Sequence, residues 1–593
     1  MLTPPIKAIP IKSTFTRFVL SSINAKHTGP KRLPGYLALA CAAILAGCHT
    51  APNQSPGAEL SFAERCQALP AAGAPGLQRA EFQANQTVQH RFAPQEVLPP
   101  HCEAFGTLEP RTGIDDQEYA IGYHLRLPEH WNGKFFFEGG GGTNGNIGTA
   151  TGTTGATNPS ALAQGYAVVS QDSGHSNDLN NNPQASGTAS FGHDPIARRN
   201  YGHASLKKVS DAAVAAITRF YGQSPRYSYF MGCSKGGQEG MAFAQRYPEV
   251  FDGIVASAPG MSLPRAALSQ LRDVQQFAQL AMTPGDTSLD PEKLAKVFSA
   301  EQITTLQTTV IKTCDGLDGL EDGIISNFSA CTNARVIPQL RQQVCSDAAR
   351  CLTSQQVSAL EQSLAGPVNK KGEPIYAAWP WDTGVGSPGW QMWKLGNEQM
   401  PALNVMLGGT ATPAIFSVPP VAVAATPQAA AAYALAFDVA DGEAIINATS
   451  DTFTTSAWQD ISARSANLDG FMARGGKLIV PHGVSDPVFS INDTLAWLQE
   501  VTARYGQQTN STVRVFPVPG MAHCFGGPST NQYDAFTAIT QWVEQNQTPD
   551  EIIATAGPDT PWPERSRPLC PHPQMAVYNG NGSIEDASNF NCK

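Results

Sequence analysis

The sequence predicts an α/β fold, in which a mostly parallel sheet is covered by helices on both faces. Three observations predict it. Short apolar runs alternate with helical stretches before Gly260, the same alternation returns near Gly475, and a serine stands in a glycine-rich turn between an apolar run and a helix. Strands that alternate with helices along a chain are typical of parallel sheets.

The first set of elements lies between residues 133 and 251. Strands are predicted in the runs 133–145, which passes from aromatic residues into a glycine loop at 139–142, 165–175 and 227–232. Helices are predicted at 207–222, where Val209, Ala212, Val214 and Ile217 recur with a helical period, and at 238–251. Helices therefore follow the second and the third of these strands, as parallel pairing requires.

The second set has strands at 475–483 and 512–520, with helices at 493–506 and 533–545. Between the two sets the alternation stops. That region holds a tryptophan cluster at 379, 381, 390 and 393 and an Ala/Pro/Val-rich piece at 401–434. We therefore expect one catalytic domain, with parts at 66–262 and 451–593, and a large lid at 263–450 inserted between its strands.

The N-terminal residues resemble an export signal. Lys31 and Arg32 precede an apolar run at 35–47 that is too short to span a bilayer and that ends at Cys48. Residues 1–47 are therefore predicted to be a lipoprotein-type signal peptide, Cys48 a lipidated residue, and 48–65 a tether. Ordinary cleavage nearby is the alternative. We expect a protein exported to the periplasm, anchored to the outer membrane by lipid, or secreted.

The charge argues against nucleic acid as a partner, because 39 Lys and Arg against 49 Asp and Glu give a net charge of −10. The only membrane contact expected is the possible lipid anchor. A chain of 593 residues with 41% hydrophobic residues has ample material for a large core. These proportions, with 15% charged residues, fit a folded exported protein with many loops.

Ten of the 12 cysteines remain when Cys41 and Cys48 are set aside, an even number in a chain predicted to enter an oxidising compartment. The sequence alone leaves the connectivity open. Their grouping along the chain suggests four disulfides: Cys66–Cys102, Cys314–Cys331, Cys345–Cys351 and Cys570–Cys592. Cys233 and Cys524 are left over.

The glycine-rich turn is Gly232-Cys233-Ser234-Lys235-Gly236, which has the strand–turn–helix setting of a nucleophile elbow. A serine nucleophile needs a histidine base and a carboxylate, which follow it in the order acid, then histidine, in an α/β-hydrolase fold. Asp486 and His523 stand after successive strands in that order. His482 is a rival base that precedes the acid, and weaker rival acids are Asp451, Asp460 and Asp469.

An ester hydrolase also needs two backbone donors for the oxyanion. We expect one at the amide of Lys235, directly after the serine, and the other in the glycine loop 139–142, at Gly142 or next at Gly141. The two cysteines left over adjoin Ser234 and His523, so a Cys233–Cys524 disulfide would hold the nucleophile and the base together.

The chain resembles the tannase and feruloyl esterase family of α/β-hydrolases, whose mark is Cys-Ser, Asp and His-Cys with a disulfide between the two cysteines. Those residues are Cys233-Ser234, Asp486 and His523-Cys524 here, and the similarity runs from about Cys66 to the C-terminus, including 520–528 and 567–592. The runs at 138–145 and 389–396 look most similar to the members that hydrolyse terephthalate monoesters.

A short acidic loop at 314–327 offers Asp315, Asp318 and Asp322 as oxygen ligands, which suits Ca²⁺, although a solvated acidic turn is the alternative. The resemblance implies a structural calcium site in the lid, formed by these carboxylates and the carbonyls of Leu320 and Ile324.

The resemblance also implies that Trp393 and Phe489 flank an aromatic acyl group. Family members that act on terephthalate monoesters use a lid arginine for the free carboxylate of the substrate, but no arginine lies between Met392 and Ala434 here. Asn404 stands near that place, and a neutral amide cannot form the charged bidentate pair.

The sequence therefore predicts a serine carboxylic ester hydrolase for esters of aromatic acids. The expected substrates are hydroxycinnamate or other plant aryl esters and mono(2-hydroxyethyl) terephthalate, with gallate esters, as in a tannase, third. The alternatives are a surface lipoprotein that binds aromatic compounds without catalysis, and an enzyme that transfers the acyl group to an alcohol or amine.

Overall fold

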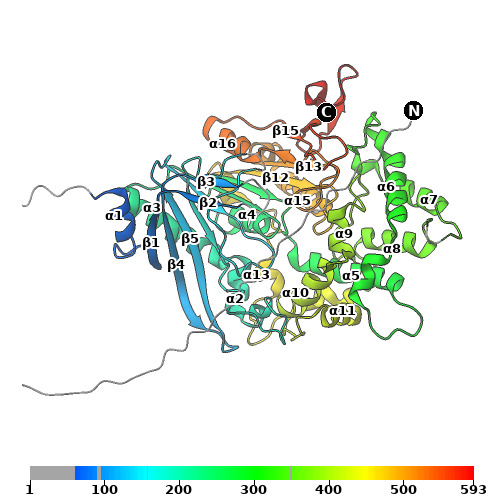
Figure 1. Ribbon diagram of the computed structural model, residues 1–593, viewed down its shortest axis with the longest axis horizontal. Coiled ribbons are helices and arrows are strands. Elements are labelled where there is room, and N and C mark those ends of the chain that lie inside the picture. The colour runs from blue at the N-terminus through cyan, green and yellow to red at the C-terminus, as the bar shows by residue number, and fades with distance from the viewer. Residues whose placement is uncertain (1–59, 90–94, 156–157, 348–349) are drawn as a thin grey trace, which may run out of the picture. The chain divides into compact units, whose positions relative to one another are not determined.

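The computed structural model describes residues 60–89, 95–155, 158–347 and 350–593 (Figure 1). The predicted signal peptide, the lipidation at Cys48 and most of the tether lie outside the described residues. Leu60–Lys593 forms one compact unit. No helix among the described residues has the length and apolar character needed to cross a membrane.

A nine-stranded sheet forms the centre of the fold, in the order β1-β4-β5-β7-β6-β8-β9-β12-β13. Its strands are β1 (Leu77–Gln83), β4 (His101–Thr112), β5 (Glu118–Pro128), β6 (Lys134–Glu138), β7 (Ala167–Gln171), β8 (Tyr227–Cys233), β9 (Gly253–Ser257), β12 (Lys477–Gly483) and β13 (Val513–Val518). The pairs from β7 through β6, β8, β9 and β12 to β13 are all parallel. The predicted α/β class is therefore correct.

The other edge of the sheet is antiparallel. β1 pairs with β4, β4 with β5, and β5 with β7 in this sense. The sequence analysis does not predict β1, β4 or β5. Helix α1 (Phe62–Ala68) is joined to β4 by the Cys66–Cys102 disulfide.

The parallel strands are apolar on both faces because helices cover both faces. Phe135 and Phe137 of β6 pack in the same core as α3 (Ser205–Tyr221), α4 (Lys235–Arg246) and α15 (Ile491–Tyr505). Phe136, between them, points into the opposite core with α16 (Ala535–Gln545). This alternation explains why the sequence shows continuous apolar runs rather than an apolar–polar pattern at these strands.

The segment 258–476 between β9 and β12, here called the insertion, is mainly helical, and most of its buried residues share one core with Tyr119, Phe191 and Tyr201. In Figure 1 its green and yellow helices gather beside the sheet. They are α5 (Leu263–Ala281), α6 (Ala300–Cys314), α7 (Asn333–Gln342), α8 (Ser354–Ala365), α9 (Pro388–Lys394), α10 (Gly409–Ala414), α11 (Pro427–Ala436), α12 (Gly442–Ile446), α13 (Ala457–Ile461) and α14 (Asp469–Ala473). Its core also takes in Val484, Val488 and Phe489, which follow β12. The lid boundaries 263–450 stay a prediction.

The remaining α-helix and the remaining strands are short. They are α2 (Pro195–Arg199), β2 (Gln86–Val88), β3 (Glu96–Leu98), β10 (Gly396–Asn397), β11 (Met400–Pro401), β14 (Gln532–Tyr533), β15 (Ile552–Thr555), β16 (Ser566–Leu569), β17 (Ala576–Tyr578) and β18 (Phe590–Cys592). The Cys570–Cys592 disulfide connects the segment after β16 to β18.

Candidate active site

Ser234 lies on the sharp turn from β8 to α4, with φ +66° and ψ −119°. A positive φ is unfavourable for a serine, and it is typical of a nucleophile held above the carboxyl end of a strand. The turn depends on close backbone contacts, because a Cβ at Gly236 would come within 2.6 Å of the Gly140 carbonyl oxygen. Glycine is therefore needed at Gly236 for the turn to pack against the glycine loop.

His523 connects Ser234 to Asp486. Its Nε2 lies 2.8 Å from Ser234 Oγ, and its Nδ1 lies 2.7 Å from Asp486 Oδ2. Three loops at the carboxyl ends of β8, β12 and β13 bring these residues together. The Ser234–His523 contact can pass the proton of the serine hydroxyl to the imidazole, and Asp486 faces the other ring nitrogen.

Asp486 is fully buried, and its second oxygen, Oδ1, accepts hydrogen bonds from the amides of Val488 (2.8 Å) and Phe489 (3.1 Å). Burial alone would raise the pKa of this carboxyl. The charges and hydrogen bonds of His523 and His482 outweigh burial and hold the pKa of Asp486 well below its usual range. Asp486 is therefore ionised at neutral pH.

The rival residues have other partners. His482 is fully buried, and its ring nitrogens contact Thr494 Oγ1 at 2.9 Å and the Phe489 carbonyl at 3.0 Å. Its Nε2 also lies 3.5 Å from Asp486 Oδ2, so His482 neighbours the acid and not the serine. Asp460 pairs with buried Arg198 and Asp469 pairs with Arg504 at the surface. None of these contacts reaches Ser234.

All five expected disulfides are present: Cys66–Cys102, Cys233–Cys524, Cys314–Cys331, Cys345–Cys351 and Cys570–Cys592. Cys233–Cys524 spans 291 residues of sequence, with its Cα atoms 6.1 Å apart. It connects the residue before Ser234 with the residue after His523. The covalent bond thus limits how far the serine and the imidazole can separate.

Buried polar side chains form hydrogen bonds with the glycine loop 139–142. Glu239 Oε2 accepts the Gly140 amide at 2.8 Å, while Oε1 accepts Lys235 Nζ at 3.0 Å and Asn144 Nδ2 at 2.9 Å. The Tyr201 hydroxyl donates to the Gly142 carbonyl at 3.2 Å. The sequence analysis identified the amide of Lys235 but missed Glu239 and Asn144. The only local signal was the i, i+4 spacing of Lys235 and Glu239.

Two aromatic side chains flank the imidazole. The ring centroids of Trp393 and Phe489 both lie 5.4 Å from that of His523, and both rings meet the imidazole edge to face. Asn404 has different surroundings. Its side chain is fully buried, and Nδ2 donates to Asp273 Oδ2 at 2.9 Å, an oxygen that also pairs with Lys394. A substrate-binding role for Asn404 stays a prediction.

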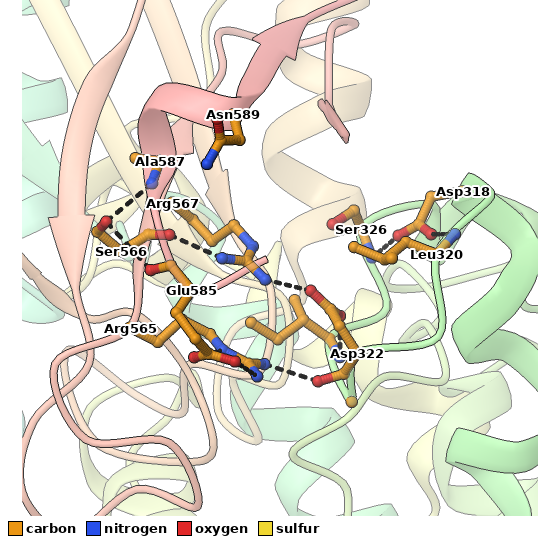
Figure 2. A network of polar contacts seen from close by, with 12 residues as sticks. Asp318, Leu320, Asp322, Ser326, Arg565, Ser566, Arg567, Glu585, Ala587 and Asn589 are labelled. Atoms are coloured by element: carbon orange, nitrogen blue, oxygen red, sulfur yellow. Dashed lines mark hydrogen bonds and ion pairs between the residues drawn. The ribbon is translucent and has the colours of Figure 1, made fainter. Parts of the chain in front are cut away.

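The acidic loop is part of the insertion and faces the C-terminal segment (Figure 2). Asp318 accepts the amides of Leu320 (3.0 Å) and Ser326 (3.1 Å). Asp322 pairs with Arg567, and the Asp322 carbonyl accepts from Arg565 at 2.6 Å. Of the predicted carbonyl ligands, that of Ile324 accepts the Ser326 amide at 3.0 Å.

The residues of this loop suit a bound cation only in part. Asp315 Oδ1 is buried and has no hydrogen-bond partner, and burial, followed by the charges of Asp322 and Asp318, raises the pKa of Asp315 to about 6. A cation would satisfy that oxygen and offset the charge. Asp322, however, is engaged by Arg567, and no group of three or more His, Cys, Asp or Glu within the described ranges is arranged to hold a metal. Asp315 thus has a buried oxygen that a cation could satisfy, whereas Asp322 is engaged by Arg567, and the calcium site stays a prediction.

The parallel sheet, the elbow and the Ser–His–Asp contacts together define an α/β-hydrolase. The profile described as "Tannase and feruloyl esterase" matches residues 102–593. The chain is 41% identical over 523 residues to mono(2-hydroxyethyl) terephthalate hydrolase of Piscinibacter sakaiensis, covering 84% of this chain and 85% of that protein. It is 25% identical to a probable feruloyl esterase of Arthroderma benhamiae, covering 81% and 83%. The protein belongs to the tannase and feruloyl esterase family, whose members are carboxylic ester hydrolases.

Solved structures agree with the fold. Feruloyl esterase B from Aspergillus oryzae superposes with a TM-score of 0.68 at 21% identity, over 90% of this chain and 100% of that one. Tannin acyl hydrolase from Aspergillus niger gives a TM-score of 0.62 at 18% identity, over 90% and 95%. The predicted α/β-hydrolase fold is thus confirmed.

Proposed function

We propose that the protein hydrolyses esters of aromatic carboxylic acids, with Ser234 as the nucleophile, His523 as the general base and acid, and Asp486 as the carboxylate that orients His523. The contact of His523 with both Ser234 Oγ and Asp486 Oδ2, at 2.8 and 2.7 Å, carries this proposal.

In the proposed reaction, His523 Nε2 takes the proton of the Ser234 hydroxyl as Oγ attacks the ester carbonyl carbon. The amides of Lys235 and of Gly142 or Gly141 would stabilise the oxyanion. The amides of Gly141 and Gly142 donate no hydrogen bond within the described residues, so both are available to an oxyanion. His523 then protonates the departing alcohol, and a water molecule, deprotonated by His523, releases the acid from the acyl-enzyme.

An aromatic acyl group is supported by Trp393 and Phe489, whose rings lie beside the imidazole that must approach the ester. Aromatic rings favour edge-to-face or offset contact with one another. The similarity to mono(2-hydroxyethyl) terephthalate hydrolase supports a terephthalate monoester as one substrate. The absence of arginine between Met392 and Ala434 favours substrates without a free carboxylate, such as methyl ferulate or methyl gallate.

The test is hydrolysis of methyl ferulate, methyl gallate and mono(2-hydroxyethyl) terephthalate by wild type and Ser234→Ala. We expect turnover of at least one of these esters by wild type and none by the variant. A serine-directed phosphonate should label wild type alone, which separates an enzyme from a binding protein with an inactive hydrolase fold. Turnover retained in Ser234→Ala would overturn the proposal, and adding a competing alcohol distinguishes hydrolysis from acyl transfer.

We also propose that the protein is exported, with Cys48 as a lipid anchor, and that it carries a structural calcium ion. Five disulfides support export, because disulfides persist in oxidising compartments. The buried, unpartnered oxygen of Asp315 supports the calcium ion, which Asp315 and Asp318 would hold.

A further inference from the structure

The loops that carry Asp486 and His523 both contact one segment of the insertion, residues 376–384. The Trp379 indole Nε1 donates to the Asp486 carbonyl at 2.8 Å. Further along the same loop, Ser490 Oγ donates to the Ala378 carbonyl at 2.7 Å. The segment therefore follows the acid loop closely on both sides of Asp486.

Asp382 is the charged residue of this segment, and it has no exposed surface. Its Oδ2 accepts a hydrogen bond from Ser485 Oγ at 2.5 Å and another from the Gly520 amide at 2.7 Å. Ser485 directly precedes Asp486, and Gly520 lies three residues before His523. One carboxylate oxygen thus connects the acid loop and the histidine loop.

Two further hydrogen bonds lie beside the contact of Asp382 with the two loops. The Gly384 amide donates to Ser485 Oγ at 2.9 Å, and the Ser485 amide donates to the Met521 carbonyl at 3.1 Å. A Cβ at Gly384 would lie 2.6 Å from both the Gly520 carbonyl oxygen and Ser485 Oγ. A side chain at Gly384 would therefore push the two loops apart.

Asp382 has no cationic partner in the described part of the chain, and its Oδ1 has no hydrogen bond there. Burial raises the pKa of Asp382 to about 6. A buried carboxyl group with an unsatisfied oxygen lowers the stability of a fold. Outside its own segment, Asp382 accepts hydrogen bonds from the loops that carry Asp486 and His523, so its contribution is expected to lie in their geometry.

We propose that Asp382 is a positioning residue for catalysis: by accepting from Ser485 and Gly520 through one oxygen, it fixes the loop of Asp486 relative to the loop of His523. The insertion thereby sets the geometry of the His523–Asp486 hydrogen bond as well as covering the site. This inference rests on the proposed Ser–His–Asp chemistry.

The test compares Asp382→Ala with Asp382→Asn. The alanine variant loses the acceptor for both loops. We expect kcat to fall on the order of tenfold or more and KM to stay nearly unchanged, because small misplacements of catalytic groups slow the reaction. The downfield NMR resonance of the His523–Asp486 proton should weaken. The asparagine variant keeps one carbonyl oxygen and should recover most of the kcat and the resonance.

A matched control is Asn333→Ala, which removes the acceptor for the indole of Trp381, the neighbour of Asp382. It should lower the thermal midpoint without changing kcat or the resonance. Wild-type kcat and resonance in Asp382→Ala, or equal loss in Asp382→Asn, would overturn the inference.

If Asp382→Ala does not fold, Ser485→Ala breaks the hydrogen bond to the acid loop alone, and it should lower kcat and shift the resonance. An unchanged kcat and resonance in Ser485→Ala would likewise overturn the inference. A wild type without Ser234-dependent activity would refute the proposed function. The NMR resonance is measured without turnover, so it would still test the role of Asp382 in that case.

Discussion

At Asp486, burial and charge act in opposite directions on one carboxylate. Burial favours the neutral form, yet His523 and His482 keep the pKa below its usual range. The ionised carboxylate accepts from His523 Nδ1, which leaves Nε2 free to accept the proton of Ser234. The residue therefore controls which nitrogen of the imidazole carries the proton.

We predict that Asp486→Asn folds but loses about 10⁴-fold in kcat, because an amide NH₂ facing Nδ1 favours the wrong tautomer of His523. Steady-state kinetics on an ester that wild type hydrolyses, together with the thermal midpoint, checks this. Asp469→Asn is the control, since Asp469 pairs with Arg504 at the surface. A loss of less than tenfold would argue against Asp486 as the orienting acid.

Asp172 gives a pH prediction at the same scale. It accepts the amides of Gly122 (2.9 Å) and Gly174 (2.8 Å), and burial raises its pKa to about 7. The folded protein therefore holds a proton on Asp172 at pH values where the unfolded chain has released it. The contribution of Asp172 to stability is fully present below pH 3.8 and declines as the pH rises to about 7.

We expect the thermal midpoint of Asp172→Asn to fall less steeply with rising pH across this window than that of wild type. The comparison uses the slope, because the amide can accept only one of the two backbone donors and lowers the midpoint at every pH. Parallel slopes for the two proteins would contradict the assigned pKa.

At the scale of elements, the turn β8–α4 and the loop after β13 are connected covalently by Cys233–Cys524. Loop entropy predicts that a crosslink across some 291 residues stabilises the fold by about 5 kcal/mol, before any strain is subtracted. The double variant Cys233→Ala/Cys524→Ala should lower both the thermal midpoint and kcat. Cys345→Ala/Cys351→Ala, which opens a loop of only 6 residues, should change kcat little. Equal kinetic effects of the two pairs would show that Cys233–Cys524 has no special role at the site.

The glycine loop depends on α4 through Glu239. In Glu239→Gln an amide NH₂ would face either the buried ammonium of Lys235 or the amide of Gly140, both of which are donors. We expect kcat to fall on the order of tenfold with KM retained, since displacing an oxyanion donor weakens transition-state binding alone. Inactivation by a phosphonate should slow in parallel. The control is Asp460→Asn, which breaks the equally buried pair with Arg198 and should lower only stability.

At the scale of the whole molecule, the sequence predicts those elements that have a clear local pattern, either a continuous apolar run or a helical period of apolar residues. The apolar run of β12 and the amphipathic α15 lie where expected. The long strands β4 and β5, which pair as consecutive antiparallel neighbours, were missed because polar residues interrupt their apolar positions: His101 and Glu103 in β4, His124 and Arg126 in β5. Asp382 and Glu239 could not be found from local pattern, since a buried carboxylate is recognised only by partners brought close by the fold. Motifs and order along the chain were enough to predict Ser234, Asp486 and His523 as a triad, and these are side chains that the structure brings into contact.

The acidic loop is one of the places where the insertion contacts the rest of the molecule. Arg565 and Arg567 reach it from the C-terminal segment, and the Ile325 amide donates to Thr383 Oγ1, next to Asp382, at 2.9 Å. A cation on Asp315 and Asp318 would therefore stabilise contacts between three segments. Because a metal bound only by the folded state raises stability by mass action, chelation with EGTA should lower the thermal midpoint by several degrees.

Added Ca²⁺ should restore the midpoint, and Mg²⁺ should not, since Mg²⁺ requires a stricter octahedral geometry. Asp315→Asn/Asp318→Asn should have a reduced midpoint that no longer responds to EGTA or Ca²⁺. Asp286→Asn, in an acidic turn outside the loop where Asp286 accepts from Thr283, should respond as wild type does. If EGTA does not change the thermal midpoint of wild type, the ion pair of Asp322 with Arg567 stabilises the contact between the acidic loop and the C-terminal segment without a metal.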